Sequence, residues 1–104
     1  MRFLVLDRGA KFPLAPEHLG PMLDAFAEWR ERYRGKMESF EWFLNGGGFG
    51  VVDVADEREL HAMILELPFA FTDTIEVHPI IDGDAALAAT REIWATKLAQ
   101  APPA

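Results

Sequence analysis

The 104-residue sequence contains no cysteine, only one serine and no long hydrophobic run. Without cysteine, the chain has neither a disulfide framework nor a thiol nucleophile. The single serine, Ser39, is not part of a G-x-S-x-G motif, which argues against a serine hydrolase. The missing hydrophobic run argues against a membrane span, and the apolar segment before Asp7 is too short for a signal peptide. We therefore expect a cytoplasmic protein with no membrane partner.

Basic residues are also few and scattered. The chain has 10 Lys and Arg against 17 Asp and Glu, and its formal net charge is -7. Phosphate backbones repel such a surface unless its positive charge is concentrated in one place. Only Arg30, Arg32 and Arg34 lie close together, and Glu28 and Glu31 are interleaved with them. This pattern is typical of a helix face with ion pairs, so no nucleic-acid partner is expected.

Recognisable motifs for metals and cofactors are absent as well. The three histidines, His18, His61 and His78, fall on different predicted elements and form no H-E-x-x-H pair. The glycine-rich segment 44–50, LNGGGFG, matches neither the dinucleotide-binding fingerprint nor the phosphate-binding P-loop. We therefore expect no metal and no cofactor.

What the sequence does contain is a regular succession of strand and helix signals over a single domain, residues 1–104. Short β-prone runs and amphipathic stretches predict a strand at 2–7, a helix at 16–34, strands at 37–44 and 49–54, a helix at 56–67, a strand at 72–81 and a helix at 85–100. The order β-α-β-β-α-β with an extra C-terminal helix predicts an α+β, ferredoxin-like fold. Such a fold has a four-stranded antiparallel sheet with both long helices on one face.

Local signals support the helices. The first helix carries an apolar stripe that should face the core, formed by Leu19, Met22, Phe26, Trp29 and Tyr33. Asp56 and Glu59 form a capping box at the start of the second helix, and Asp84 is expected to cap the third. The third helix is expected to contact the domain through its large apolar residues, which are Leu87, Ile93, Trp94 and Leu98.

The pattern of apolar residues in the first strand indicates that both faces of the sheet must be covered. Phe3 and Val5 point to one face of the sheet, whereas Leu4 and Leu6 point to the other. Both faces are therefore apolar, and the helices can cover only one of them. We expect the second face to pack against the sheet of another subunit, as in dimeric α/β barrels, giving a homodimer or a higher homo-oligomer.

Proton transfer is the chemistry that the titratable residues match best, because it needs only one or two groups of suitable pKa beside a bound apolar substrate. Alternation places Glu76 and His78 on the same side of the last strand. Asp7, Glu41 and Asp53 lie within otherwise apolar strands, where desolvation would raise the pKa of a carboxyl group and make it a base near neutral pH. Alternatively, these residues lie on sheet edges or pair across a dimer.

Aromatic residues could form the walls of a binding cavity. A flat cavity between the sheet and the helices would be lined by side chains of the second strand and the first helix, namely Phe40, Trp42, Phe43, Phe26 and Trp29. The alternative is that these rings are plain core. Asn45 lies at the predicted hairpin turn between the two middle strands, where its tolerance of positive φ is expected to matter.

Residues 51–80 resemble the second half of muconolactone isomerase and its relatives. The matching features are V-x-D-V at 51–54, Leu60-His61, Leu67-Pro68 followed by aromatics, and Ile75-Glu76-Val77. The resemblance implies a small, cofactor-free, ferredoxin-like protein that associates into dimers and larger rings. It also implies an isomerase that shifts a double bond within an unsaturated lactone during the catabolism of aromatic compounds. His61 and Glu76 are carried over as matching positions.

The second strand departs from that family. The family enzyme has a tryptophan-arginine pair there, whereas this chain has Glu41-Trp42-Phe43. The missing cation weakens the case for an anionic, carboxylate-bearing lactone as substrate, because nothing obvious replaces the fork-shaped donor of arginine.

Three hypotheses follow for the function. In the first, the chain is a cofactor-independent isomerase for a small cyclic or aromatic-derived acid or lactone, with Glu76 or His78 as the base, and with His61 or a carboxylate of the sheet assisting. In the second, it is a cofactor-free monooxygenase in which Trp42, Trp29 and Asn45 hold a phenolic or polyketide-like substrate. In the third, it is a ligand-binding or assembly module without turnover. Carboxylate and imidazole groups that converge on an apolar pocket would favour the isomerase.

Overall fold

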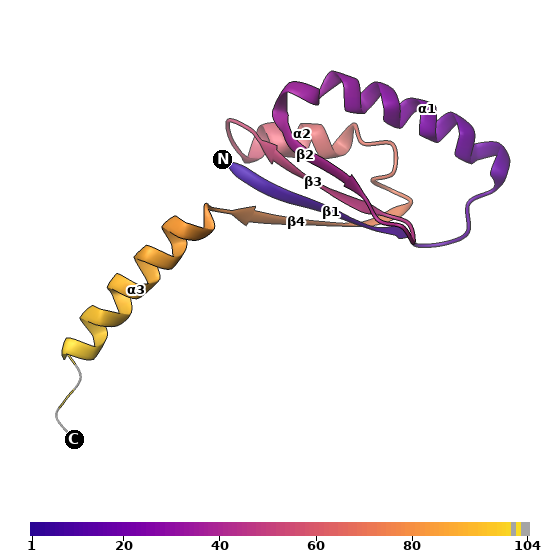
Figure 1. Cartoon of the computed structure of the whole chain (residues 1–104). Coiled ribbons are helices and arrows are strands. Elements are labelled where there is room, and N and C mark those ends of the chain that lie inside the picture. The colour runs from indigo at the N-terminus through magenta and orange to yellow at the C-terminus, as the bar shows by residue number, and fades with distance from the viewer. Residues whose placement is uncertain (101, 103–104) are drawn as a thin grey trace.

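The computed structural model of the protein describes residues 1–100 and 102. Its elements are, in chain order, β1 (Arg2–Ala10), α1 (Pro16–Arg32), a short 3-10 helix η1 (Arg34–Lys36), β2 (Met37–Trp42), β3 (Gly48–Asp53), α2 (Glu57–Leu65), β4 (Asp73–Ile80) and α3 (Gly83–Gln100). The strands form one antiparallel sheet in the order β2-β3-β1-β4. Figure 1 shows α1 and α2 on the same side of this sheet. The arrangement confirms the predicted α+β, ferredoxin-like fold.

The hydrophobic core lies between the sheet and these two helices. Phe3 of β1 and Val52 of β3 are directly opposite each other in the ladder, so their side chains point to the same face. Both are buried, together with Trp29 of α1 and Met63 of α2. The indole Nε1–H of Trp29 donates a hydrogen bond of 3.0 Å to the Met63 carbonyl, so the polar atom of this large buried ring is satisfied. This bond also ties α1 to α2.

The start of α2 follows the predicted capping box. The Asp56 side chain accepts a 2.9 Å hydrogen bond from the Glu59 N–H, and the Glu59 carboxylate accepts one of 2.7 Å from the Ala55 N–H. Glu59 thus reaches the residue before the N-cap instead of the N-cap itself. Two backbone donors that would otherwise lack a partner are satisfied in this way.

The β2-β3 hairpin differs from the prediction in its turn. The Phe43 N–H donates to the Gly47 carbonyl at 2.9 Å and closes the turn. Gly46 and Gly47 have positive φ angles of 97° and 77°, whereas the φ angle of Asn45 is not positive. The expectation that Asn45 adopts positive φ is therefore wrong, because the two glycines that follow it supply the left-handed backbone at lower steric cost.

The third helix departs most from expectation. The Asp82 carboxylate, not that of Asp84, caps its first turn by accepting a 2.9 Å hydrogen bond from the Ala85 N–H. Figure 1 shows α3 projecting away from the rest of the protein, and the chain with α3 measures 68 × 28 × 23 Å along its principal axes. The apolar residues expected to contact the domain are all more than half exposed, namely Leu87, Ile93, Trp94 and Leu98. That expectation is wrong, because α3 runs away from both faces of the sheet and has no buried residue.

The second face of the sheet has no helix of the described chain over it in Figure 1. Leu4, Leu6, Phe49 and Val51 point to this face and are only half-buried. In residues 1–100 and 102 no helix combines the length and the apolar character that crossing a membrane requires.

Candidate functional site

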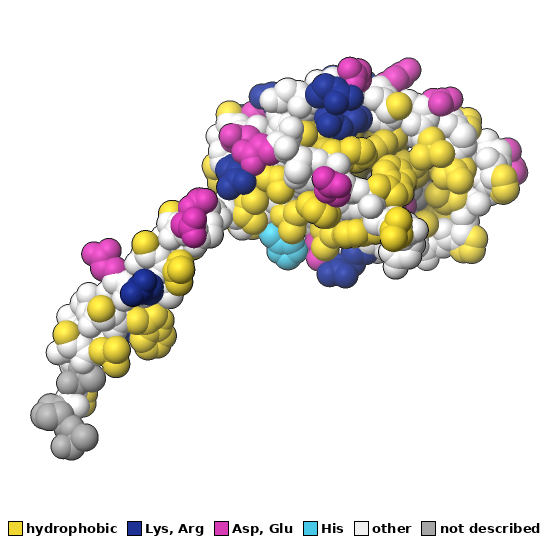
Figure 2. Space-filling view, in the orientation of Figure 1, with side chains coloured by type: hydrophobic (Ala, Val, Ile, Leu, Met, Phe, Trp, Pro, Cys, Tyr) yellow, Lys and Arg dark blue, Asp and Glu magenta, His cyan; other side chains and the backbone are white. Residues whose placement is uncertain are grey.

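A cavity of about 280 Å³ lies between α1 and the sheet. Its mouth is formed by Leu19 and Leu23 of α1 and by the β2-β3 hairpin, and hydrophobic side chains gather around it in Figure 2. A dry cavity of roughly 150 Å³ is known to hold one benzene molecule, so this one has room for a single ring with several substituents.

Glycines in β3 leave the space on the sheet side of the cavity. Gly48 lies opposite Asp7 and Gly50 lies opposite Val5, so both glycines face the helices and line the cavity. A Cβ atom at Gly50 would come within 2.9 Å of the Met37 side chain. Any other residue at Gly48 or Gly50 would reduce the cavity or push β2 away.

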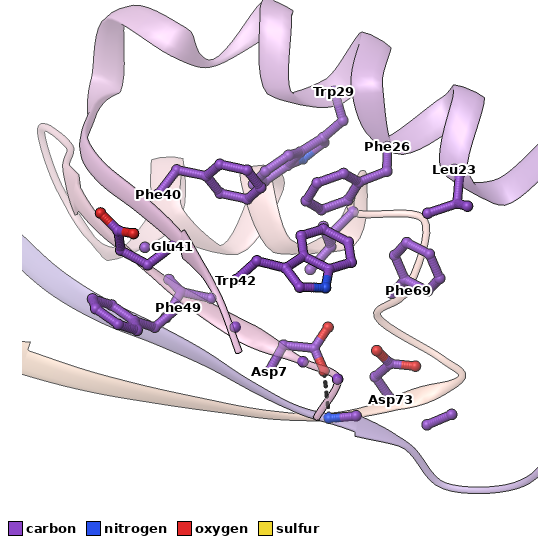
Figure 3. A pocket seen from close by; sticks show the side chains of 18 of the residues that line it. Asp7, Leu23, Phe26, Trp29, Phe40, Glu41, Trp42, Phe49, Phe69 and Asp73 are labelled. Carbon is purple, nitrogen blue, oxygen red and sulfur yellow. Dashed lines mark hydrogen bonds between the residues drawn. The ribbon is translucent and has the colours of Figure 1, made fainter. Parts of the chain in front are cut away.

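Aromatic rings from α1, from β2 and from the segment before β4 form the apolar walls of the cavity (Figure 3). Phe26 of α1 is at the centre of this group, with ring centroids 5.6 Å from Phe40, 5.7 Å from Phe69 and 5.9 Å from Trp42. The Trp42 ring meets Phe26 edge-on and is 56% exposed, which places it at the mouth. Such a cluster offers apolar faces on which a planar ring can stack.

Two carboxyl groups, Asp7 and Asp73, lie at one end of this otherwise apolar cavity (Figure 3). A β-bulge brings them together, because Asp7 pairs with Ile75 whereas Ala10 pairs with Asp73, leaving an extra residue in β1. Gly9 lies in the bulge with φ of 98°, a conformation that strongly favours glycine. Asp73 is buried, with only 7% of its surface exposed.

Both carboxyl groups are held by neighbouring donors. The Gly9 N–H donates a 2.8 Å hydrogen bond to Asp7 Oδ1, and the Thr72 hydroxyl donates one of 3.0 Å to Asp73 Oδ1. Each carboxyl group is therefore fixed through one oxygen, which leaves the other available to its neighbour or to a ligand.

The environment of Asp7 favours its protonated form. Burial raises the pKa of Asp7 to about 7, and a hydrogen bond and charge repulsion from Asp73 act in the same direction, against a smaller opposing effect of the Gly9 N–H. Near neutral pH Asp7 can therefore hold a proton that it donates to a ligand, and a second carboxyl group, Asp73, lies at the same end of the cavity.

The residues predicted to bind substrate lie together. Phe26, Trp29, Trp42 and Asn45 all line the cavity. Trp29 is 5% exposed and its N–H is bonded to Met63, so it forms an inner wall, whereas Trp42 lies at the mouth.

The residues predicted to be catalytic lie elsewhere. Glu76 is opposite Leu6 and His78 is opposite Leu4, so both point to the face of the sheet away from the helices. There Glu76 makes an ion pair of 2.6 Å with Arg8, which lowers the Glu76 pKa, and its second oxygen is 3.3 Å from His78 Nε2. His61 is exposed on α2. None of the three lines the cavity.

Sequence reasoning missed Asp73. The strand predicted at 72–81 contains Asp73, and alternation places its side chain on the same face as that of Ile75. No pattern in the sequence predicts the bulge that brings Asp73 close to Asp7. Within the described residues, no group of three potential ligands is arranged to hold a metal ion.

Comparison with known proteins supports the fold. No family model and no curated protein sequence matches the chain. Among solved structures, the chain is similar to 5-chloro-2-hydroxyhydroquinone dehydrochlorinase from Burkholderia phenoliruptrix AC1100 in complex with 2,5-dihydroxybenzoquinone. The match has a TM-score of 0.67 at 17% sequence identity and covers 82% of this chain and 98% of the dehydrochlorinase. The chain therefore shares the ferredoxin-like fold of a known enzyme.

Proposed function

We propose that this protein is an enzyme without a cofactor that moves a proton on a small cyclic, aromatic-derived compound bound in the cavity. The reaction best matched is isomerisation, in which a double bond of an unsaturated lactone or related ring shifts position. One observation carries the proposal: two adjacent carboxyl groups, Asp7 and Asp73, lie at the end of an apolar cavity, and the pKa of Asp7 is raised to about 7.

The pair suits both halves of such a reaction. A carboxylate accepts the proton when a C–H bond of the substrate breaks, and the electron pair of that bond moves into the conjugated system. The neighbouring carboxylic acid then donates its proton to a different carbon, where the new C–H bond forms. No proton is gained or lost overall, and because both carboxyl groups lie at the same end of the cavity, they can exchange roles in the next turnover.

This assignment moves the chemistry away from the residues that the sequence suggested. Glu76 and His78 lie on the opposite face of the sheet, and His61 is exposed on α2, so none of them reaches a ligand in the cavity. The substrate contacts suggested from the sequence keep their proposed role, because Phe26, Trp29, Trp42 and Asn45 line the cavity.

A second candidate is elimination, in which a base removes a proton and a leaving group such as chloride departs. The name of the structurally similar dehydrochlorinase favours it, and the same carboxylate would serve as base. Oxygenation has less support, because Trp42, Trp29 and Asn45 line the cavity together with two carboxyl groups, which suit proton transfer. Two carboxyl groups that converge on the cavity likewise favour an enzyme over a module without turnover.

We also propose that the active form is a homodimer or a larger homo-oligomer. The face of the sheet away from the helices carries Leu4, Leu6, Phe49 and Val51, which remain half-buried in the single chain. Covering them with the sheet of a second copy removes apolar surface from water.

Deuterium exchange tests the proton transfer even when the product is unidentified. A panel of unsaturated lactones and enolisable phenols is incubated with the protein in D₂O, and ¹H NMR follows the loss of C–H signals. Asp7→Asn and Asp73→Asn are each expected to slow the exchange roughly 10²-fold or more. Asp53→Asn is the matched control, because Asp53 is an exposed carboxylate that does not line the cavity. Exchange that persists in both variants, or that disappears only in Glu76→Gln, would contradict the proposal.

A further inference from the structure

The charge of the cavity limits what it can bind. The ionisable residues that line it are Asp7, Glu41 and Asp73, and no Lys, Arg or His of the described chain is among them. Glu41 pairs with Phe49, so its side chain points to the other face of the sheet, and the acidic side chains that face the cavity are Asp7 and Asp73. Arg30 is nearby, but its guanidinium lies 5.1 Å from the centre of the Phe40 ring and is not part of the lining. An anionic ligand would therefore enter a partly dry, acidic site without a partner for its charge.

The hydrogen-bonding groups define the complementary ligand. One oxygen of Asp7 is bonded to the Gly9 N–H and one oxygen of Asp73 to the Thr72 hydroxyl, so one oxygen of each group remains to accept a hydrogen bond from a ligand, and Asp7 can also donate one when it is protonated. A ligand satisfies them by bringing O–H donors. In Figure 3 the nitrogen-bearing edge of the Trp42 indole is turned toward the Asp7 carboxyl group, where it can donate to an oxygen of the same ligand.

The shape of the cavity sets the size and flatness of the ligand. The volume of about 280 Å³ is close to the lower limit for small-molecule sites and fits one substituted ring. The rings of Phe26, Trp42 and Phe69 offer stacking faces, and the lack of side chains at Gly48 and Gly50 leaves room above the sheet.

We infer that the cavity takes an uncharged, single-ring compound with at least two adjacent hydroxyl or enol groups, and that it rejects rings bearing a carboxylate. The hydroxyl groups face Asp7 and Asp73, and the ring lies between Trp42 and Phe69. This inference rests on the proposed function for the identity of the site, and it adds that the acidic end selects the substrate by charge as well as transferring the proton. An acidic lactone is thereby excluded, whereas an uncharged lactone, enol or hydroxyarene that carries these adjacent hydroxyl or enol groups remains.

Three related ligands separate the effect of ligand charge on affinity from the effect of ligand size. Catechol, 3,4-dihydroxybenzoate and its methyl ester share the adjacent hydroxyl groups, and the ester is larger than the acid but uncharged. Equilibrium binding to the full chain at pH 7.5 is measured by isothermal titration calorimetry. We expect catechol and the ester to bind at least about tenfold more tightly than the acid, which corresponds to about 1.4 kcal/mol. Equal or tighter binding of the acid would overturn the inference, and so would failure of all three to bind.

Variants locate the source of the selectivity. Asp73→Asn is expected to narrow the gap between ester and acid, whereas Asp53→Asn, outside the cavity, is expected to leave it unchanged. Circular dichroism checks that each variant is folded, and the comparison on the unmodified protein stands even if Asp73→Asn does not fold. A gap that survives unchanged in folded Asp73→Asn would overturn the role given to the carboxyl pair.

The binding experiment and the exchange experiment test the substrate class and the proposed catalysis independently of each other. If the ester binds more tightly than the acid but no compound exchanges its C–H protons, the substrate class stands and the proposed catalysis does not. If exchange depends on Asp7 and Asp73 but the acid binds as tightly as the ester, the proposed function stands and the charge selection is wrong.

Discussion

The carboxyl groups of Asp7 and Asp73 lie at the same end of the cavity, next to the bulge in the β1-β4 ladder. Burial makes the ionisation of Asp7 unfavourable, and the negative charge of its neighbour adds to this effect. The ionised form of Asp7 therefore lowers the stability of the folded protein. Perturbed pKa values of this kind are often found at catalytic sites.

The pH dependence of stability should reveal the raised pKa of Asp7. In the folded protein the pKa is about 7, against an ordinary value of 3.8, so between these pH values the folded state binds more protons than the unfolded state. Stability contributed by this group is therefore lost as pH rises from about 4 to about 7 and stays lost above that. Asp7→Asn should be more stable than the unmodified protein at pH 8 by about 1–3 kcal/mol and nearly equal to it at pH 4.

Thermal unfolding followed by circular dichroism at several pH values measures this difference. Taking the difference between the two proteins removes the contribution of the exposed carboxylates whose pKa values are lowered by ion pairs, such as Glu31 and Glu76. A difference that does not change between pH 4 and pH 8 would show that Asp7 titrates normally.

Trp42 and Trp94 provide a matched pair for ligand binding. They are 56% and 57% exposed, but only Trp42 lines the cavity. Trp42→Ala should weaken the binding of a ring ligand about tenfold, because a stacking face is lost, while Trp94→Ala should leave the affinity unchanged. Trp42→Phe should restore most of the affinity. Calorimetric titration with catechol gives the three affinities, and an equal loss in both alanine variants would contradict the assigned site.

Alanine substitutions at Gly46 and Gly47 distinguish the energetic cost of backbone strain from that of a steric clash. Both have positive φ, but a Cβ atom at Gly46 would meet nothing within 4 Å, whereas one at Gly47 would lie 2.3 Å from the Asp7 carbonyl oxygen. Gly46→Ala should cost about 1 kcal/mol of unfolding free energy. Gly47→Ala should cost clearly more and should also reduce proton exchange, because β1 must shift at Asp7. Urea unfolding and the exchange assay test both effects, and equal costs at the two positions would refute the close approach.

The main effect of replacing Trp29 should be on the stability of the fold. Its ring is buried and its N–H is bonded to the Met63 carbonyl. Trp29→Phe keeps an aromatic ring but leaves that carbonyl without its partner, and we expect a loss of about 1–3 kcal/mol in urea unfolding. Little change would mean that the hydrogen bond between α1 and α2 contributes nothing net.

Association is expected through the face of the sheet away from the helices. Sedimentation velocity at micromolar concentration should show at least a dimer, and Leu6→Glu should shift it toward monomer, because packing this face against a second copy would then bury an unpaired charge. Leu65→Glu adds the same charge at an exposed position of α2 and should have no such effect. A stable monomer of the unmodified protein would defeat the proposed assembly.

Much of this protein is determined by local sequence. The apolar stripe of α1, the capping box at Asp56 and the glycine turn after Asn45 are short-range patterns, and each acts through neighbouring residues along the chain. They are sufficient to predict the order of strands and helices, and with it the ferredoxin-like fold. The aromatic walls of the cavity follow from the same patterns, because Phe26 and Trp29 belong to the stripe that must face the sheet.

Tertiary structure decided where the titratable groups lie. Alternation along β4 correctly places Glu76 and His78 on one side, but both faces of the sheet are apolar, so local patterns do not tell which face the helices cover. That choice turns Glu76 and His78 outward and Asp7 inward. The bulge at Gly9 then sets Asp73 beside Asp7, because the register between strands distant in sequence depends on how their backbones pair, and no local pattern encodes that pairing.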